Sequence, residues 1–161
     1  MVKGIYIPVD ESLPIELREF NGLEDYMNAV DGLIEAVDID RPDATMFVNE
    51  EGKIHGLDVN RRACLLLWVH NSRYRGLGSI EGNVVLVGQP DDEGNTLSVP
   101  EELEALLLRT HVYQYQITTI NEPGTWYGNQ RVFEDWVEAY KAALYKSQTW
   151  ALVDEVRVVP A

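Results

Sequence analysis

The chain has 161 residues, a length that fits one ordinary domain. Hydrophobic residues make up 45% of it, with four tryptophans, eight tyrosines and three phenylalanines, so the chain can bury a core and is not a disordered tail. A formal net charge of −14 argues against general binding of nucleic acid or of an anionic membrane.

Targeting and redox signals are sparse. Apolar runs such as residues 63–69 fall far short of the roughly 20 residues needed to cross a bilayer, and the first residues lack the pattern of a signal peptide. A single cysteine, Cys64, cannot form an intramolecular disulfide and, within an apolar run, is expected to be buried. We therefore expect a cytoplasmic protein without a membrane partner.

The first elements read clearly. Residues 3–9 and 15–20 alternate between apolar and polar side chains around a turn-rich segment, which predicts a β-hairpin. Apolar residues at helical spacing predict a short helix over 23–30. Residues 34–39 favour a strand, although a helix continued through Val37 would keep the apolar stripe equally well.

The next segment suggests a second hairpin. Residues 44–48 read as a strand, and 49–53 have the composition of a tight turn that leads back into a strand at 54–57. Residues 62–70 are almost all apolar, and they fit a buried helix or a buried strand because periodicity cannot separate the two.

The middle of the chain alternates loops with regular elements. Residues 71–80 have a loop composition, whereas 83–88 read as a buried strand. Ser98 is placed to cap a helix with Glu101 as its reciprocal partner, and that helix should end near Arg109.

The last third should contain a strand, a helix and a strand. Residues 112–120 alternate as a strand that residues 121–124 break, the strongest helical stripe runs from 129 to 144, and 152–159 close as a strand. We expect its many aromatic rings to belong to the core rather than to a base-stacking platform. These rings are Trp126, Tyr127, Phe133, Trp136, Tyr140, Tyr145 and Trp150.

These elements predict an α+β fold. It should be a single compact domain in which about three helices pack on a mixed or antiparallel sheet. We expect residues 1–109 to form its main part and residues 110–161 a strand-helix-strand extension packed on it.

Charge is distributed unevenly. Residues 76–108 contain no lysine or arginine, whereas 53–75 hold a basic island with a single acidic residue. Two interpretations stay open: ion pairs with acids folded beside the island, or an anion pocket of guanidinium groups. The candidate anion-binding residues are Lys53, Asn60, Arg61, Arg62, Arg73 and Arg75.

Catalytic and metal motifs are absent. The glycines at 76, 78 and 82 are one residue away from a dinucleotide fingerprint, and no phosphate-binding loop or nucleophile elbow occurs. The spacing of His55, Cys64, His70 and His111 matches no zinc pattern. We therefore expect no metal and no cofactor.

One part of the sequence resembles a known family. The segment 48–63, which contains Asn-Glu-Glu-Gly-Lys, Gly-Leu and Asn-Arg, and the later Gly82–Gly88 are similar to a family from bacteriophages and conjugative elements that is described only as a domain of unknown function. The resemblance covers roughly residues 2–90. It implies a mobile-element origin, a location in the host cytoplasm and an accessory role, but no mechanism. Its matched positions Asn49, Gly52, Asn60, Arg61 and Gly88 are equally compatible with turns and with function.

Three functions follow as hypotheses. The favoured one is a non-enzymatic accessory protein that binds a host or defence protein with a basic surface, with mimicry of DNA by carboxylates as a special case. The second is a protein that binds a small anionic ligand or nucleotide through the basic island. The third is a small enzyme, which ranks last because no acid, base and nucleophile group by spacing. The sequence leaves the oligomeric state open, with a homodimer as one option.

Overall fold

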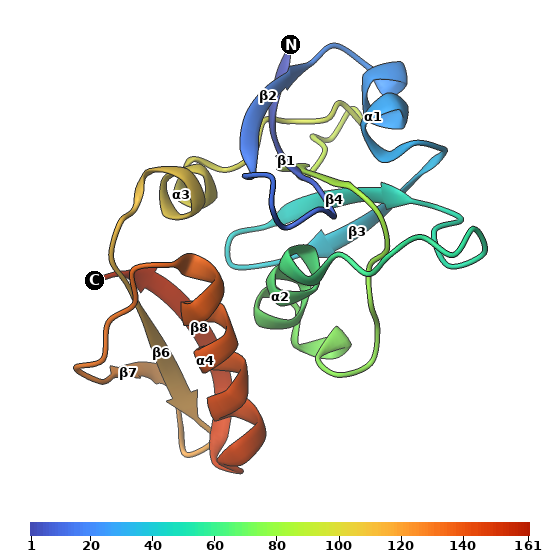
Figure 1. Ribbon diagram of the computed structural model, residues 1–161. Coiled ribbons are helices and arrows are strands. Elements are labelled where there is room, and N and C mark those ends of the chain that lie inside the picture. Colours follow the sequence, from blue (N-terminus) through green and yellow to red (C-terminus); the bar gives the residue numbers. More distant parts are fainter.

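Two antiparallel sheets organise the chain in the computed structural model, which describes residues 1–161 (Figure 1). The larger sheet has the strand order β2-β1-β5-β4-β3 and the smaller one β7-β6-β8. The strands are β1 (Val2–Ile7), β2 (Glu16–Phe20), β3 (Ile34–Ile39), β4 (Ala44–Asn49), β5 (Val84–Gly88), β6 (Tyr113–Thr119), β7 (Glu122–Gly128) and β8 (Val153–Pro160). The helices are α1 (Leu23–Val30), α2 (Arg61–His70), α3 (Glu101–Glu104), which continues as a π-helical turn over Ala105–Arg109, and α4 (Trp136–Thr149), with a 3-10 turn at Ser72–Tyr74.

Strand β5 lies at the centre of the larger sheet, and all five of its residues are buried. Val85 and Val87 pack in the cluster that contains α1, whereas Val84 and Leu86 join the main core with α2. A strand covered on both faces needs apolar residues at every position, which explains the unbroken run that the sequence shows here.

Helix α2 lies between the larger sheet and the C-terminal part of the chain. Eight of its ten residues are buried, because the sheet covers one side of the helix and α4 packs on the other. Helix α4 in turn packs on β6 and β8 of the smaller sheet (Figure 1). Because of this layering, a cluster of 29 buried residues extends from Ile5 to Val158.

The α+β prediction is confirmed, with every strand pair antiparallel. The first hairpin, the helix over 23–30 and the strands at 34–39, 44–48 and 83–88 form as expected, and the ambiguous apolar segment is the helix α2. None of the helices combines the length and the apolar character that crossing a membrane requires.

The hairpin expected between 44–48 and 54–57 is wrong. Residues 50–56 form consecutive turns, and β4 pairs with β3 on one edge and with β5 on the other. Since both edges of β4 are occupied, no edge remains for a strand at 54–57.

The predicted helix starts also need correction. Ser98 does not cap α3, because its hydroxyl accepts a hydrogen bond from the backbone N–H of Lys3 at 3.0 Å. The last helix begins at Trp136 and not near 129, with the Asp135 side chain accepting from the N–H of Val137. The apolar spacing predicted an earlier start because it includes Phe133. The backbone of Phe133 is extended and forms a β-bridge with Tyr113.

Strand β7 was not expected, since residues 121–124 were interpreted only as a break. The chain turns there and returns along β6 as an edge strand. Most of its residues are exposed, so β7 carries little of the apolar alternation by which strands are recognised. The aromatic segment divides accordingly: Trp136 and Tyr140 are buried in the core, whereas Tyr145 and Trp150 are exposed.

Candidate functional site: an acidic cleft

The two partly or fully buried arginines of the basic island bind backbone carbonyl groups. The Arg62 guanidinium donates hydrogen bonds to the carbonyl oxygens of Pro8 (2.7 Å), Leu13 (2.8 Å) and Asp10 (3.1 Å). Arg75 donates to the carbonyl oxygen of Trp68 at 2.8 Å and so binds the last turn of α2. Both groups hold chain segments in place.

The other island residues point to different places. Asn60 caps α2 by accepting from the N–H of Ala63, and its amide donates to the carbonyl oxygens of Ile7 and Gly82. Lys53 forms an ion pair with Glu81 at 2.7 Å. Arg61 and Arg73 are exposed and form no ion pair.

The structure does not bring the six residues together. Of the cavities in this molecule, one is lined by Lys53 and a different one by Arg62. The sequence could not predict which groups the Arg62 guanidinium contacts, because its partners lie 49 to 54 residues away along the chain.

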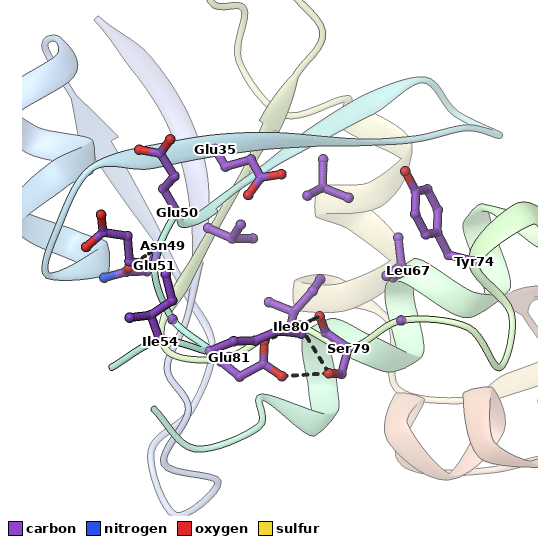
Figure 2. Close-up of a pocket in the computed structure, with 15 residues that line it drawn as sticks. Glu35, Asn49, Glu50, Glu51, Ile54, Leu67, Tyr74, Ser79, Ile80 and Glu81 are labelled. Carbon is purple, nitrogen blue, oxygen red and sulfur yellow. Dashed lines mark hydrogen bonds and ion pairs between the residues drawn. The ribbon is translucent and has the colours of Figure 1, made fainter. Parts of the chain in front are cut away.

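A cleft lined mainly by acidic residues is formed in part by residues that overlap or flank the basic island in the sequence. It has a volume of about 290 Å³ and lies between β3, the end of β4 with its following turn, helix α2 and the segment 74–81. Four carboxylates and one ammonium group line this acidic cleft, and Figure 2 shows Glu35 reaching into it from β3 with Glu81 and Ser79 on the opposite side. The charged lining residues are Glu35, Glu50, Glu51, Glu81 and Lys53.

Two of the four carboxylates have local partners. Glu81 accepts hydrogen bonds from Lys53 and from the Ser79 hydroxyl; burial alone would raise its pKa, but these hydrogen bonds and the lysine charge together lower it. Glu51 lies 2.8 Å from the His55 ring. Glu35 and Glu50 have no hydrogen bond or ion pair from any side chain. Glu35 and Glu50 are therefore free to interact with a cation.

The floor of the acidic cleft is apolar. Val48, Leu67 and Ile80 line it and are 7%, 2% and 4% exposed. Tyr74, which is 45% exposed, adds an aromatic ring at one end (Figure 2). An apolar floor under a carboxylate rim suits a ligand that joins an aliphatic chain to a positive head group.

The cleft wall is built by the Asn-Glu-Glu-Gly-Lys motif. The Asn49 amide donates to the carbonyl oxygens of Val30 and Asp31, and its side-chain oxygen accepts from the N–H of Glu51. A Cβ atom on Gly52 would lie 3.1 Å from that of Glu81, so glycine permits the close approach of the two walls. Asn49 and Gly52 thus position the acidic residues between and beside them.

Gly88 has a structural role as well. A Cβ atom there would overlap the carbonyl oxygen of Ser98, so the loop before α3 can pack on β5 only if residue 88 is glycine. Of the side chains at the positions matched by the resemblance, Asn49 and Asn60 form hydrogen bonds, whereas Arg61 forms neither a hydrogen bond nor an ion pair.

The residues considered as metal ligands are separate. Cys64 is buried, where its sulfur accepts from the N–H of Ile80 and burial raises its pKa. His70 is buried against Tyr140, whereas His55 is exposed beside Glu51. No three histidine, cysteine, aspartate or glutamate side chains are grouped as ligands for a metal ion.

Comparison with known proteins places this fold in a family. No curated protein and no solved structure matches the chain. Residues 2–112 match the family described as Domain of unknown function (DUF3846), which confirms the expected resemblance and extends it beyond residue 90. The acidic cleft, with lining residues from 35 to 81, lies wholly within this segment. Since the match covers more than half of its length, the chain belongs to the DUF3846 family.

Proposed function

We propose that this protein is a non-enzymatic accessory protein of a bacteriophage or another mobile element. It binds a host or defence protein by accepting a basic side chain of that partner. The observation that carries the proposal is the acidic cleft, in which four carboxylates surround an apolar floor. A lysine or arginine of the partner would place its aliphatic stem on Leu67 and Ile80 and its charged head between Glu35 and Glu50. The mobile-element origin rests on the resemblance alone.

Long-range electrostatics support the same partner. A net charge of −14 attracts a basic surface from a distance comparable to the Debye length, about 10 Å at 0.1 M salt, and accelerates encounter. Binding should therefore weaken as salt increases. The alternative of a small anion bound by the basic island has no such support, because Lys53 and Arg62 line different cavities.

Charge-matched variants test the proposal. The double variant Glu35→Gln/Glu50→Gln removes the two unpartnered carboxylates of the acidic cleft. The control Glu19→Gln/Glu24→Gln removes the same charge at exposed positions on β2 and α1 outside the cleft. Both are used for titration with a defined arginine-rich peptide and as bait in host lysate, at low and at high salt.

We expect the cleft variant to bind the peptide at least about tenfold more weakly than wild type and to lose the captured basic protein, as breaking hydrogen-bonded charge pairs costs about 1.5–3 kcal/mol each. The control should change affinity by less than about threefold. Equal losses in both variants would show that only net charge matters and would overturn the role of the cleft. For the special case of DNA mimicry, duplex DNA should displace the captured protein.

A further inference from the structure

A second cleft lies in the C-terminal part of the chain, outside the segment that matches the family. It has a volume of about 560 Å³, within the range of roughly 300–1,000 Å³ common for small-molecule sites. Its walls come from β6, from β7 with the turn before it, and from the end of α4. Helix α4 packs on β6 and β8, and the edge strand β7 lies on the other side of β6 from β8 (Figure 1). We call this second cleft the aromatic cleft.

Three aromatic rings line the aromatic cleft. Tyr115 is 9% exposed and its hydroxyl accepts a hydrogen bond from the Asn129 amide at 3.2 Å, so this ring is fixed. Tyr127 and Trp150 are 46% and 40% exposed, and no other aromatic ring of the chain stacks on either of them. Exposed tyrosine and tryptophan rings beside a cavity favour a planar ligand that can stack on them.

The polar groups of the aromatic cleft leave a positive charge unmatched. The Lys146 ammonium lies 4.8 Å from the centroid of the Trp150 ring and forms no ion pair with a carboxylate. The single carboxylate of the lining, Glu122, accepts a hydrogen bond from the Tyr127 hydroxyl. Lys146 therefore has three N–H donors available to an acidic group of a ligand.

Two neutral groups of the same wall are also without side-chain partners. The Asn121 amide offers a donor and an acceptor side by side, and the Thr119 hydroxyl offers one more of each. An amide of this kind complements the donor and acceptor pattern along the edge of a nucleobase. The combination of stacking rings, a free amide and a free ammonium has the chemistry of nucleotide recognition.

We propose that the aromatic cleft binds a nucleoside monophosphate. The base stacks on Tyr127 and Trp150 with its edge at Asn121, and the phosphate lies at Lys146. A nucleic-acid strand or a nucleoside triphosphate is disfavoured, because the chain has a net charge of −14 and the aromatic cleft offers one cation. The site uses no residue of the acidic cleft, so it is independent of the proposed protein partner.

Calorimetric titration with AMP, adenosine and methyl glucoside tests the site. We expect AMP to bind more tightly than adenosine, and methyl glucoside not to bind. Trp150→Ala should weaken both adenine compounds by about tenfold, the loss of one stacking partner. Lys146→Ala should weaken AMP to the affinity of adenosine and leave adenosine unchanged.

A matched control separates the aromatic cleft from aromatic surface in general. Tyr145→Ala removes a ring that is 69% exposed on the same helix and does not line the aromatic cleft, so it should leave both affinities unchanged. Thermal unfolding of each variant confirms that it is folded. The proposal is overturned by the absence of AMP binding at millimolar concentration, by AMP binding that Trp150→Ala does not weaken, or by glucoside binding with the same dependence on Trp150.

Discussion

The contact between His70 and Tyr140 links the family segment to the C-terminal part and should make stability depend on pH. His70 is 4% exposed, and its Nδ1 atom lies 3.2 Å from the carbonyl oxygens of Asp40 and Arg41. Carbonyl oxygens only accept, so Nδ1 carries the proton and Nε2 accepts from the Tyr140 hydroxyl at 2.6 Å. The folded protein therefore holds a neutral imidazole.

Burial lowers the pKa of His70 from 6.5 to about 4, and the two carbonyl hydrogen bonds oppose this shift only in part. Between these values the unfolded chain binds a proton that the folded chain does not. The contribution of the neutral His70 to the free energy of unfolding is therefore fully present above pH 6.5 and is lost as the pH falls towards 4. At about 1.4 kcal/mol per pH unit, the loss over this window is about 3 kcal/mol.

Urea unfolding at a series of pH values from 7 to 4 measures this loss, with His70→Gln as the reference that cannot titrate. We expect the free energy of unfolding of wild type to fall more steeply than that of His70→Gln, by up to about 1.4 kcal/mol per pH unit. The difference between the two proteins removes the contribution of carboxylates, which both share. NMR titration of the His70 ring gives a direct measurement. Parallel pH profiles, or a His70 ring that titrates near 6.5 in the folded protein, would refute the reasoning.

Three further substitutions separate structural from functional positions. Gly88→Ala should cost about 2 kcal/mol or more of unfolding free energy, because its Cβ overlaps a backbone oxygen. Gly124→Ala in the exposed strand β7, with open space around it, should change the unfolding free energy by less than about 0.5 kcal/mol, as thermal unfolding would show. Asn60→Ala should cost about 2–3 kcal/mol in urea unfolding, since it removes a helix cap and leaves two carbonyls without their donor. Arg62→Ala should release the β1–β2 loop to limited proteolysis, and Arg61→Ala beside it should not; equal cleavage of the two variants would contradict this assignment.

The elements that the sequence predicts well are those whose pattern is fixed by their own burial. Strand β5 shows a continuous apolar run because helices cover both of its faces. The hairpin of β1 and β2 is recognised for a different reason, the turn-rich segment between its strands, since only Phe20 of β2 is buried. The strand expected at 54–57 failed for a non-local reason, since β5 occupies the edge of β4 that it would have needed. Pairing between strands that are distant in the chain leaves no local signature.

The candidate site escaped prediction for a related reason. Glu35 comes from β3 and Glu81 from the segment before β5, and only the sheet order brings them to the turn that holds Glu50. The basic island suggested an anion site instead, because clustering of charged residues along the sequence does not reveal the partner of each group. Arg62 and Arg75 donate hydrogen bonds to backbone carbonyl oxygens, and such backbone partners cannot be recognised from residue types.

The position of α2 explains how one chain can carry two separate clefts. A helix that is buried on both sides needs two covers, and here the larger sheet of the family segment provides one and α4 the other. Residues after 112 are therefore required to bury the apolar surface of α2, whatever else they do. The aromatic cleft lies at the end of α4 and along the edge strand β7, away from this interface, so its exposed rings are not explained by the covering of α2. Tyr127 and Trp150 do not help to bury α2 and still line the aromatic cleft, and for this reason we expect a ligand in that cleft.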